Sequence, residues 1–71
     1  GKYLAYVVTA KNINNLWVMK LATKQSWQFT FATAGKNCAT PNWTPDGKQI
    51  VFLGVGFTAQ PSVFVRDFLP F

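Results

Sequence analysis

The chain has 71 residues, of which 49% are hydrophobic, 17% are aromatic and only 13% are charged, with a formal net charge of +5. A disordered tail is polar and poor in aromatic residues, so the composition excludes one. There is no His and no Glu, and the two acids are Asp46 and Asp67. The chain thus lacks the parts for Ser-His-Asp, Cys-His, His-ligated metal or paired-Glu chemistry. We expect no enzyme activity, no catalytic residue, no metal site and no cofactor.

The cysteine and hydropathy patterns exclude two further features. Cys38 is the only cysteine, so no disulfide can form within the chain, and we expect a small, unreactive strand residue there. The longest apolar runs, Tyr3–Val8 and Ile50–Phe57, are far shorter than the roughly 18 residues of a spanning helix, so no membrane span is expected. The chain opens on Gly1 without a signal peptide, which suggests a piece of a longer protein.

Strand-forming residues dominate the whole sequence and helix formers are scarce, so six strands joined by short connections are predicted. In chain order they are Lys2–Val8, Leu16–Leu21, Ser26–Phe31, Cys38–Trp43, Gln49–Leu53 and Ser62–Phe68. Asn12–Asn15 is the first predicted turn. Within the third strand, strict alternation places Trp27, Phe29 and Phe31 on one face.

The aromatic residues on these strands have two interpretations. They could stack on sugars or bases, or they could pack in a core. Their period-two spacing on strands favours the core. The set is Trp17, Trp27, Phe29, Phe31, Trp43, Phe52 and Phe64.

Thr44–Gly47 (Thr-Pro-Asp-Gly) is a predicted tight turn. Pro45 presets the backbone angle φ, Asp46 can hydrogen-bond to nearby backbone, and Gly47 accepts the positive φ that reverses the chain. The Thr44 hydroxyl can bond the amides of the turn. We therefore interpret Asp46 as a turn former rather than as a ligand.

Asn42-Trp43-Thr44 is an N-x-T sequon, so Asn42 is a candidate glycosylation site if the protein is secreted and eukaryotic. The asparagine lies in the strand that leads into the turn, where we expect a glycan to clash with packing. A coincidental match is the simpler interpretation.

The chain repeats itself. Gly1–Tyr6 matches Gly47–Phe52, and Leu16–Leu21 matches Val63–Phe68, in each case about 46 residues later. A period in the forties with four strands per unit is typical of a β-propeller blade.

Pro41–Phe52 (PNWTPDGKQIVF) resembles the TolB-type propeller repeat, which reads roughly P-x-W-S-P-D-G-K-x-I-A-F. Asn15–Leu21 and Ser62–Phe68 resemble its next strand, x-I-Y-V-M-D-L. Thr44 replaces the usual serine, and Lys20 replaces the usual aspartate of the first copy. The resemblance implies a structural turn motif made of Trp43, Thr44, Pro45, Asp46 and Gly47.

The resemblance also implies a domain organisation. Residues 1–71 would form one segment of antiparallel blade strands, with the last three strands of one blade in 1–31 and the first three of the next in 38–68. A propeller needs about four to eight blades to close, so this would be an incomplete propeller. Because its faces and strand edges would be uncovered, we expect the isolated monomer to be unstable.

Three functions follow as expectations. The favoured one is a non-catalytic scaffold that binds a protein partner, or associates with itself, through the uncovered faces and edges, in a periplasmic or secreted setting by resemblance. The alternative is a cross-β fibril or filament subunit, because Tyr3–Val8, Trp27–Phe31 and Ile50–Val55 are uncharged, proline-free and strand-prone. The second alternative is a propeller segment of a prolyl-oligopeptidase-like peptidase.

Nucleic acid is not expected as a partner despite the charge of +5. No two basic residues are adjacent, and they form no stripe. Phosphate binding needs several cations on one surface. Lysines scattered at loops and strand edges are interpreted as aids to solubility that blunt the edges.

Overall fold

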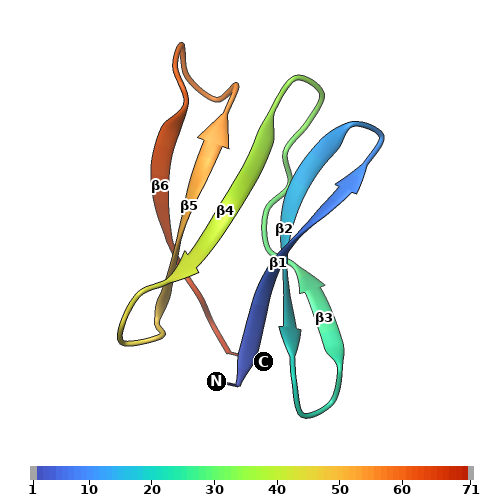
Figure 1. The fold of residues 1–71 in the computed structure, drawn as a ribbon, viewed down its shortest axis with the longest axis vertical. Coiled ribbons are helices and arrows are strands. Elements are labelled where there is room, and N and C mark those ends of the chain that lie inside the picture. The colour runs from blue at the N-terminus through green and yellow to red at the C-terminus, as the bar shows by residue number, and fades with distance from the viewer. Residues whose placement is uncertain (1, 71) are drawn as a thin grey trace.

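The computed structural model describes residues 2–70 and is all-β, with no helix in that range (Figure 1). The first sheet contains β1 (Tyr3–Ala10), β2 (Ile13–Lys20) and β3 (Gln25–Gln28), in that spatial order. The second sheet contains β4 (Asn37–Trp43), β5 (Gln49–Val55) and β6 (Ser62–Asp67), again in chain order. Every strand pair is antiparallel. The all-β class and the antiparallel pairing predicted from the sequence are confirmed.

The first hairpin turns two residues earlier than predicted. Lys11 and Asn12 have φ angles of 51° and 64°, and Ala10 pairs with Ile13 across them. A two-residue hairpin turn with positive φ at both positions matches the twist of its strands, and asparagine tolerates that conformation. β2 therefore begins at Ile13, inside the turn predicted for Asn12–Asn15.

The third strand is shorter than predicted because a bulge ends it. β3 stops at Gln28, and the N–H groups of Phe29 and Thr30 both donate to the Leu16 carbonyl, at 2.7 and 3.2 Å. Two residues that face one on the neighbouring strand form a β-bulge, which shifts the alternation of side chains by one position.

Because of the bulge, the prediction that Trp27, Phe29 and Phe31 share one face of a strand is wrong. Phe31 is 72% exposed and Trp27 is 47% exposed, while Phe29 packs beside Phe68. Of the seven aromatic residues predicted as core, only Phe52 is buried, and Phe29, Trp43 and Phe64 pack against the core from its margin.

Side chains satisfy the edge of β2 beyond the end of β3. The Leu16 N–H donates to the hydroxyl oxygen of Thr30 at 2.9 Å, and the Asn14 N–H donates to Oδ1 of Asn37 at 2.8 Å. Buried backbone N–H groups need a partner, and these two have no strand beside them. The second bond also ties β2 to the first residue of β4.

Asn15 completes this arrangement. Its Oδ1 accepts hydrogen bonds from the Thr30 hydroxyl at 2.8 Å and from the Ala32 N–H at 2.7 Å. Thr30, which is only 4% exposed, therefore both donates and accepts through one hydroxyl. The three residues fix the path of the chain as it leaves the first sheet for the second.

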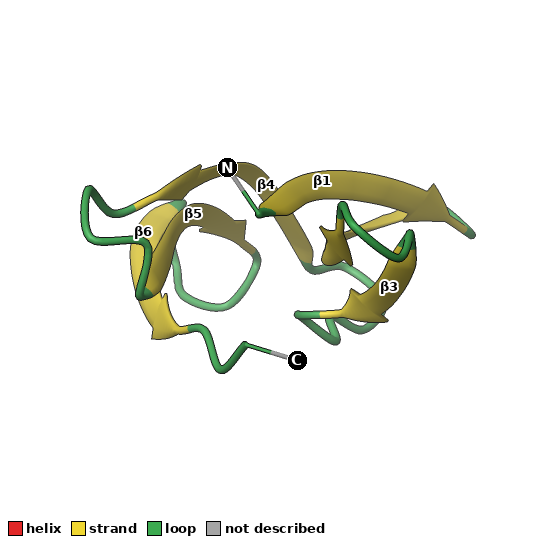
Figure 2. Cartoon of the chain, turned by 90° about the horizontal axis from the view of Figure 1, so that it is seen from below, coloured by secondary structure: helices red, strands yellow, loops and turns green. Residues whose placement is uncertain are grey.

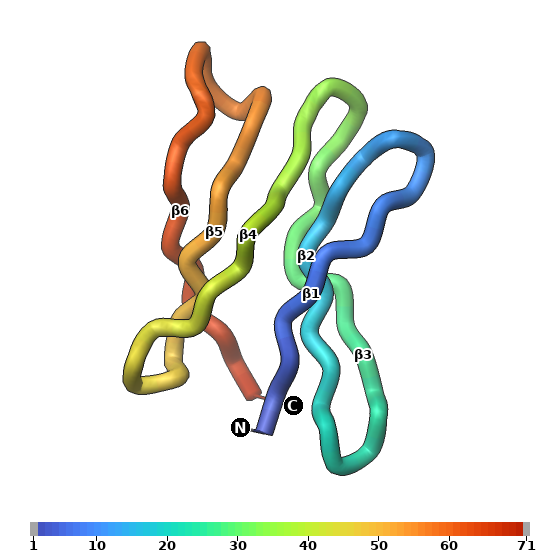
Figure 3. Tube along the Cα trace, viewed as in Figure 1, coloured from blue at the N-terminus to red at the C-terminus, as the bar shows by residue number. Residues whose placement is uncertain are grey.

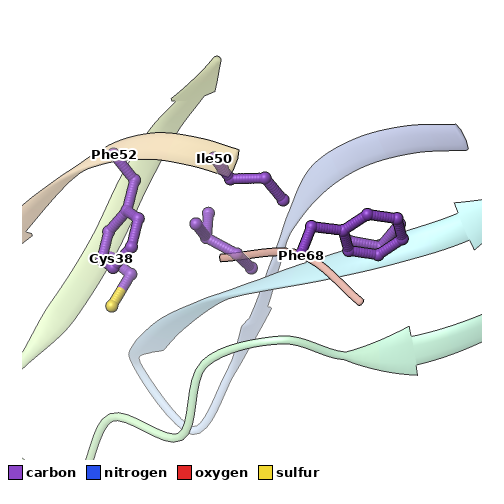
Figure 4. Packing of buried hydrophobic residues seen from close by; sticks show 6 residues of the cluster. Cys38, Ile50, Phe52 and Phe68 are labelled. Atoms are coloured by element: carbon purple, nitrogen blue, oxygen red, sulfur yellow. The ribbon is translucent and has the colours of Figure 1, made fainter. Parts of the chain in front are cut away.

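The core lies between the two sheets. Its buried members are Leu16, Val18, Cys38, Ile50, Phe52 and Phe68. Figure 4 shows Phe52 beside Cys38, with Ile50 between this pair and Phe68. β5 alternates between buried and half-buried residues from Gln49 to Gly54, as a strand with one face on a core does.

The two sheets form a wedge. β1 and β2 contact β4, whereas β3 and β6 lie apart at the open side (Figures 1 and 2). Figure 3 shows that both ends of the described chain lie at the same end of the molecule, near the β2–β3 turn. Residues 3–28 supply one side of the wedge and residues 37–67 the other.

The turn between β4 and β5 is closed by its own side chains. The Asp46 carboxylate accepts hydrogen bonds from the Thr44 hydroxyl at 2.6 Å and from the Lys48 N–H at 3.0 Å. The Thr44 hydroxyl oxygen accepts from the Gln49 N–H at 3.1 Å, and Gly47 has a φ of 72°. Because these bonds favour the ionised form, the hydroxyl first and the amide second, they hold the pKa of Asp46 below its usual value.

Thr30→Val should lower the free energy of unfolding by about 1–3 kcal/mol. Valine keeps the shape of threonine but leaves the Leu16 N–H and the Asn15 Oδ1 without the hydroxyl. The urea midpoint measures the loss. Thr30→Ser is the control because it keeps the hydroxyl, and equal midpoints for the two variants would contradict the role given to this group.

The Asp46 bonds make stability depend on pH in acid. The lowered pKa in the folded state means that this contribution is fully present above the unfolded pKa, about 3.9, and is lost as the pH falls through the folded pKa. Asp46→Asn should therefore flatten the decline of the melting temperature between about pH 5 and pH 2. Asp67→Asn, which removes the same charge outside the turn, should leave the Asp46 contribution in place. If the melting temperature of Asp46→Asn declined as steeply as that of the natural chain, the role given to the Asp46 hydrogen bonds would be refuted.

Candidate interaction groove

The open side of the wedge is a groove made of two recesses, which we name the β3–β6 groove. One recess has a volume of about 300 Å³ and reaches Cys38, Phe52 and Phe57. The other has a volume of about 540 Å³ and is bordered by Trp27, Phe29 and Leu69. Both recesses are lined by Phe31 and Arg66, so they meet at these two residues.

The wall on the second sheet is aromatic. Phe64 stacks on Phe52 with ring centroids 5.8 Å apart, and it meets Phe57 edge-on at 5.7 Å. Gly54 on β5 is buried, and a Cβ atom there would collide with the Phe64 ring. Because Gly54 has no side chain, the Phe64 ring can approach this strand closely.

Phe68 forms the floor of the larger recess. Its ring lies 4.9 Å from that of Tyr3 and 5.0 Å from that of Trp43, both edge-on, and 6.5 Å from that of Phe29. Edge-to-face pairs at these distances stabilise a fold beyond the area that they bury. The cluster joins β1, β4 and the two segments that follow β3 and β6.

Arg66 crosses the groove from the second sheet to the first. Its Nη1 donates to the Phe29 carbonyl at 3.1 Å, and its guanidinium lies 5.7 Å from the centre of the Phe29 ring. Lys36 sits near the other end, with its ammonium 6.0 Å from the Phe57 ring. Each recess therefore has a cation over one of its aromatic rings.

Of the residues singled out from the sequence, Cys38 and five aromatic residues line this groove, whereas the turn motif lies elsewhere; the five are Trp27, Phe29, Phe31, Phe52 and Phe64. Trp43 to Gly47 border a separate hollow of about 440 Å³ with Lys2 and Tyr3. Asn42 lies in β4 with its side chain exposed, so the expected clash of a glycan with packing does not arise. Cys38 is buried and forms part of the groove lining.

Sequence reasoning selected much of the aromatic lining of the groove but missed the polar residues that position it. The sequence predicts a turn at Asn15 and a strand at Thr30, whereas the hydrogen-bond partners of these two residues lie 14 to 17 positions away along the chain. Arg66 contacts Phe29 across 37 positions. The one local signal is Gly54, a glycine between strand-forming residues, which often marks a close approach.

Between residues 2 and 70, no three His, Cys, Asp or Glu side chains gather in a way that could hold a metal ion. Within the same range, no helix has the length and hydropathy needed to cross a bilayer.

The chain matches no model of a known protein family, no curated protein and no solved structure. The resemblance to the TolB-type repeat therefore rests on the motif in the sequence, and it stays a prediction.

Proposed function

We propose that the chain is a non-catalytic protein-interaction scaffold and that the β3–β6 groove is its binding surface. The observation that carries this proposal is the cluster of exposed apolar side chains at the groove. Phe31 and Leu69 are 72% and 83% exposed, and Trp27, which is 47% exposed, lines the same recess. Large contiguous apolar patches on soluble proteins mark sites of interaction.

The resemblance to TolB-type repeats supports the same proposal. If the six strands are blade strands, the first sheet belongs to one blade and the second to the next, and the chain is part of an incomplete propeller. Faces that further blades cover in a closed ring would then be open to a partner. On the same resemblance, we assign the protein a periplasmic or secreted setting.

A library of random peptides displayed on phage tests the proposal with the full chain as bait. Enriched peptides should bind Phe31→Ser at least about tenfold more weakly, because a central exposed aromatic residue is the kind that dominates binding energy. Phe31 is 72% exposed, so its loss costs the fold little. Leu4→Ser, an exposed residue on β1, is the matched control. No enrichment, or equal binding to Phe31→Ser, would count against the groove.

Self-assembly is a second candidate because of β1. This strand has eight residues and no charge, forms an edge of its sheet, and exposes Leu4, Val7 and Val8. Uncharged, flat edge strands are the usual route to fibrils, and a lysine at such an edge opposes them.

Val8→Lys should therefore lengthen the lag of any fibril formation, followed by thioflavin fluorescence. Val63→Lys, the same change on β6, is the control and should act less. A meridional reflection at about 4.7–4.8 Å identifies the fibril. Equal lags in the natural chain and in Val8→Lys would exclude β1 as the assembling edge.

A further inference from the structure

The open edge of β6 runs along the mouth of the groove. β6 is an outer strand of its sheet, and the Phe68 N–H donates to the Lys48 carbonyl at 2.9 Å. Because main-chain groups alternate in an antiparallel pair, every second residue back from Phe68 faces β5. Val63, Val65 and Asp67 therefore direct their N–H and C=O groups to the open side, where a further strand can pair.

Side chains alternate in the same way. Phe64 packs against Phe52 and Phe57, and Arg66 reaches the Phe29 carbonyl, so both point into the groove. A strand added beside β6 places every second side chain of its own into the same groove. Two groove-facing residues of that strand, spaced two positions apart, would lie opposite Phe64 and Arg66.

The charges select the kind of residue at the second position. The guanidinium of Arg66 carries five N–H donors, of which one is used on the Phe29 carbonyl. Among residues 2–70 no acid forms an ion pair with it, since Asp67 accepts from Gln49 and Asp46 is bound within its turn. A carboxylate opposite Arg66 would form a charge-assisted bond, while an apolar side chain suits the position opposite Phe64.

We propose that the β3–β6 groove binds an extended acidic peptide that adds to β6 as a strand, with an apolar residue and an Asp or Glu two positions apart on its groove-facing side. This inference rests on the proposed function and names the partner. A second copy of this chain is a poorer occupant because it brings a charge of +5 against +5. Nucleic acid is poorer too, because Arg66 is the one cation among the described residues that line the groove.

The probe is a synthetic peptide, Thr-Leu-Thr-Glu-Thr-Leu-Thr, with a fluorescent label for anisotropy titration against the full chain. It presents Leu, Glu and Leu on one face, and its symmetry allows either strand direction. Thr-Leu-Glu-Thr-Thr-Leu-Thr has the same composition but moves the carboxylate to the other face. The first peptide should bind about tenfold more tightly than the second, and about tenfold more tightly than its Gln analogue.

Two protein variants locate the binding. Arg66→Gln should remove the difference between the Glu and Gln peptides, whereas Lys11→Gln, the same loss of charge at the β1–β2 turn, should keep it. Val65→Pro removes an N–H that the sheet itself does not use, so the fold should persist while affinity falls about tenfold. Val65→Thr keeps that N–H and should bind like the natural chain.

Several results would overturn the inference. They are equal binding of the two Glu peptides, a Glu preference that survives in Arg66→Gln, tighter binding of a single-stranded oligonucleotide, or a dimer that Val65→Pro abolishes. If the phage library yields peptides that depend on Phe31 but carry no acid at this spacing, the acidic-strand inference fails and the proposed function stands. If no peptide depends on Phe31, the proposed function fails as well.

Discussion

The hydroxyl of Thr30 fixes the point at which the chain leaves the first sheet for the second, and the arrangement of the two sheets depends on it. β3 is four residues long, so the edge of β2 runs on without a neighbouring strand, and a buried N–H at Leu16 needs an acceptor. Thr30 supplies it and donates in turn to Asn15, which also fixes Ala32. The chain is thereby turned out of the first sheet at one defined point, and the next residue, Phe31, is left at the mouth of the groove.

The wedge shape follows from the place where the chain leaves the first sheet. β4 packs against β1 and β2. The hydrogen bond from the Asn14 N–H to the side chain of Asn37 holds the first residue of β4 against β2. The core therefore fills on one side of the molecule, whereas β3 and β6 have no contact that would close the other. Arg66 spans the gap with a bond to a backbone carbonyl, which leaves four of its donors for another molecule. The same geometry that completes the core on one side leaves the β3–β6 groove open on the other side.

The sequence predicted what depends on neighbouring residues. The six strands, the antiparallel class and the Thr44–Gly47 turn follow from local preference and spacing, and the structure places all of them within a few residues of the expected bounds. The bulge at Phe29 and Thr30 could not be predicted from the sequence, because the carbonyl that accepts both hydrogen bonds lies on another strand. The groove was missed for the same reason. The sequence predicts no role for Arg66, because its partner Phe29 lies 37 positions away along the chain.

The two outer edges, on β1 and β6, differ in chemistry, and the difference decides which process each favours. β1 carries no charge over eight residues and exposes aliphatic side chains, so its edge carries no charge that would oppose the proposed pairing with a similar strand. β6 ends in Arg66 and Asp67, and its groove-facing side chains are one ring and one cation. In the proposed complex, an edge of that kind would discriminate, because a strand without a matching acid would leave the guanidinium unpaired in an apolar recess. If both proposals hold, selective binding at β6 and unselective association at β1 are separable properties of one small wedge.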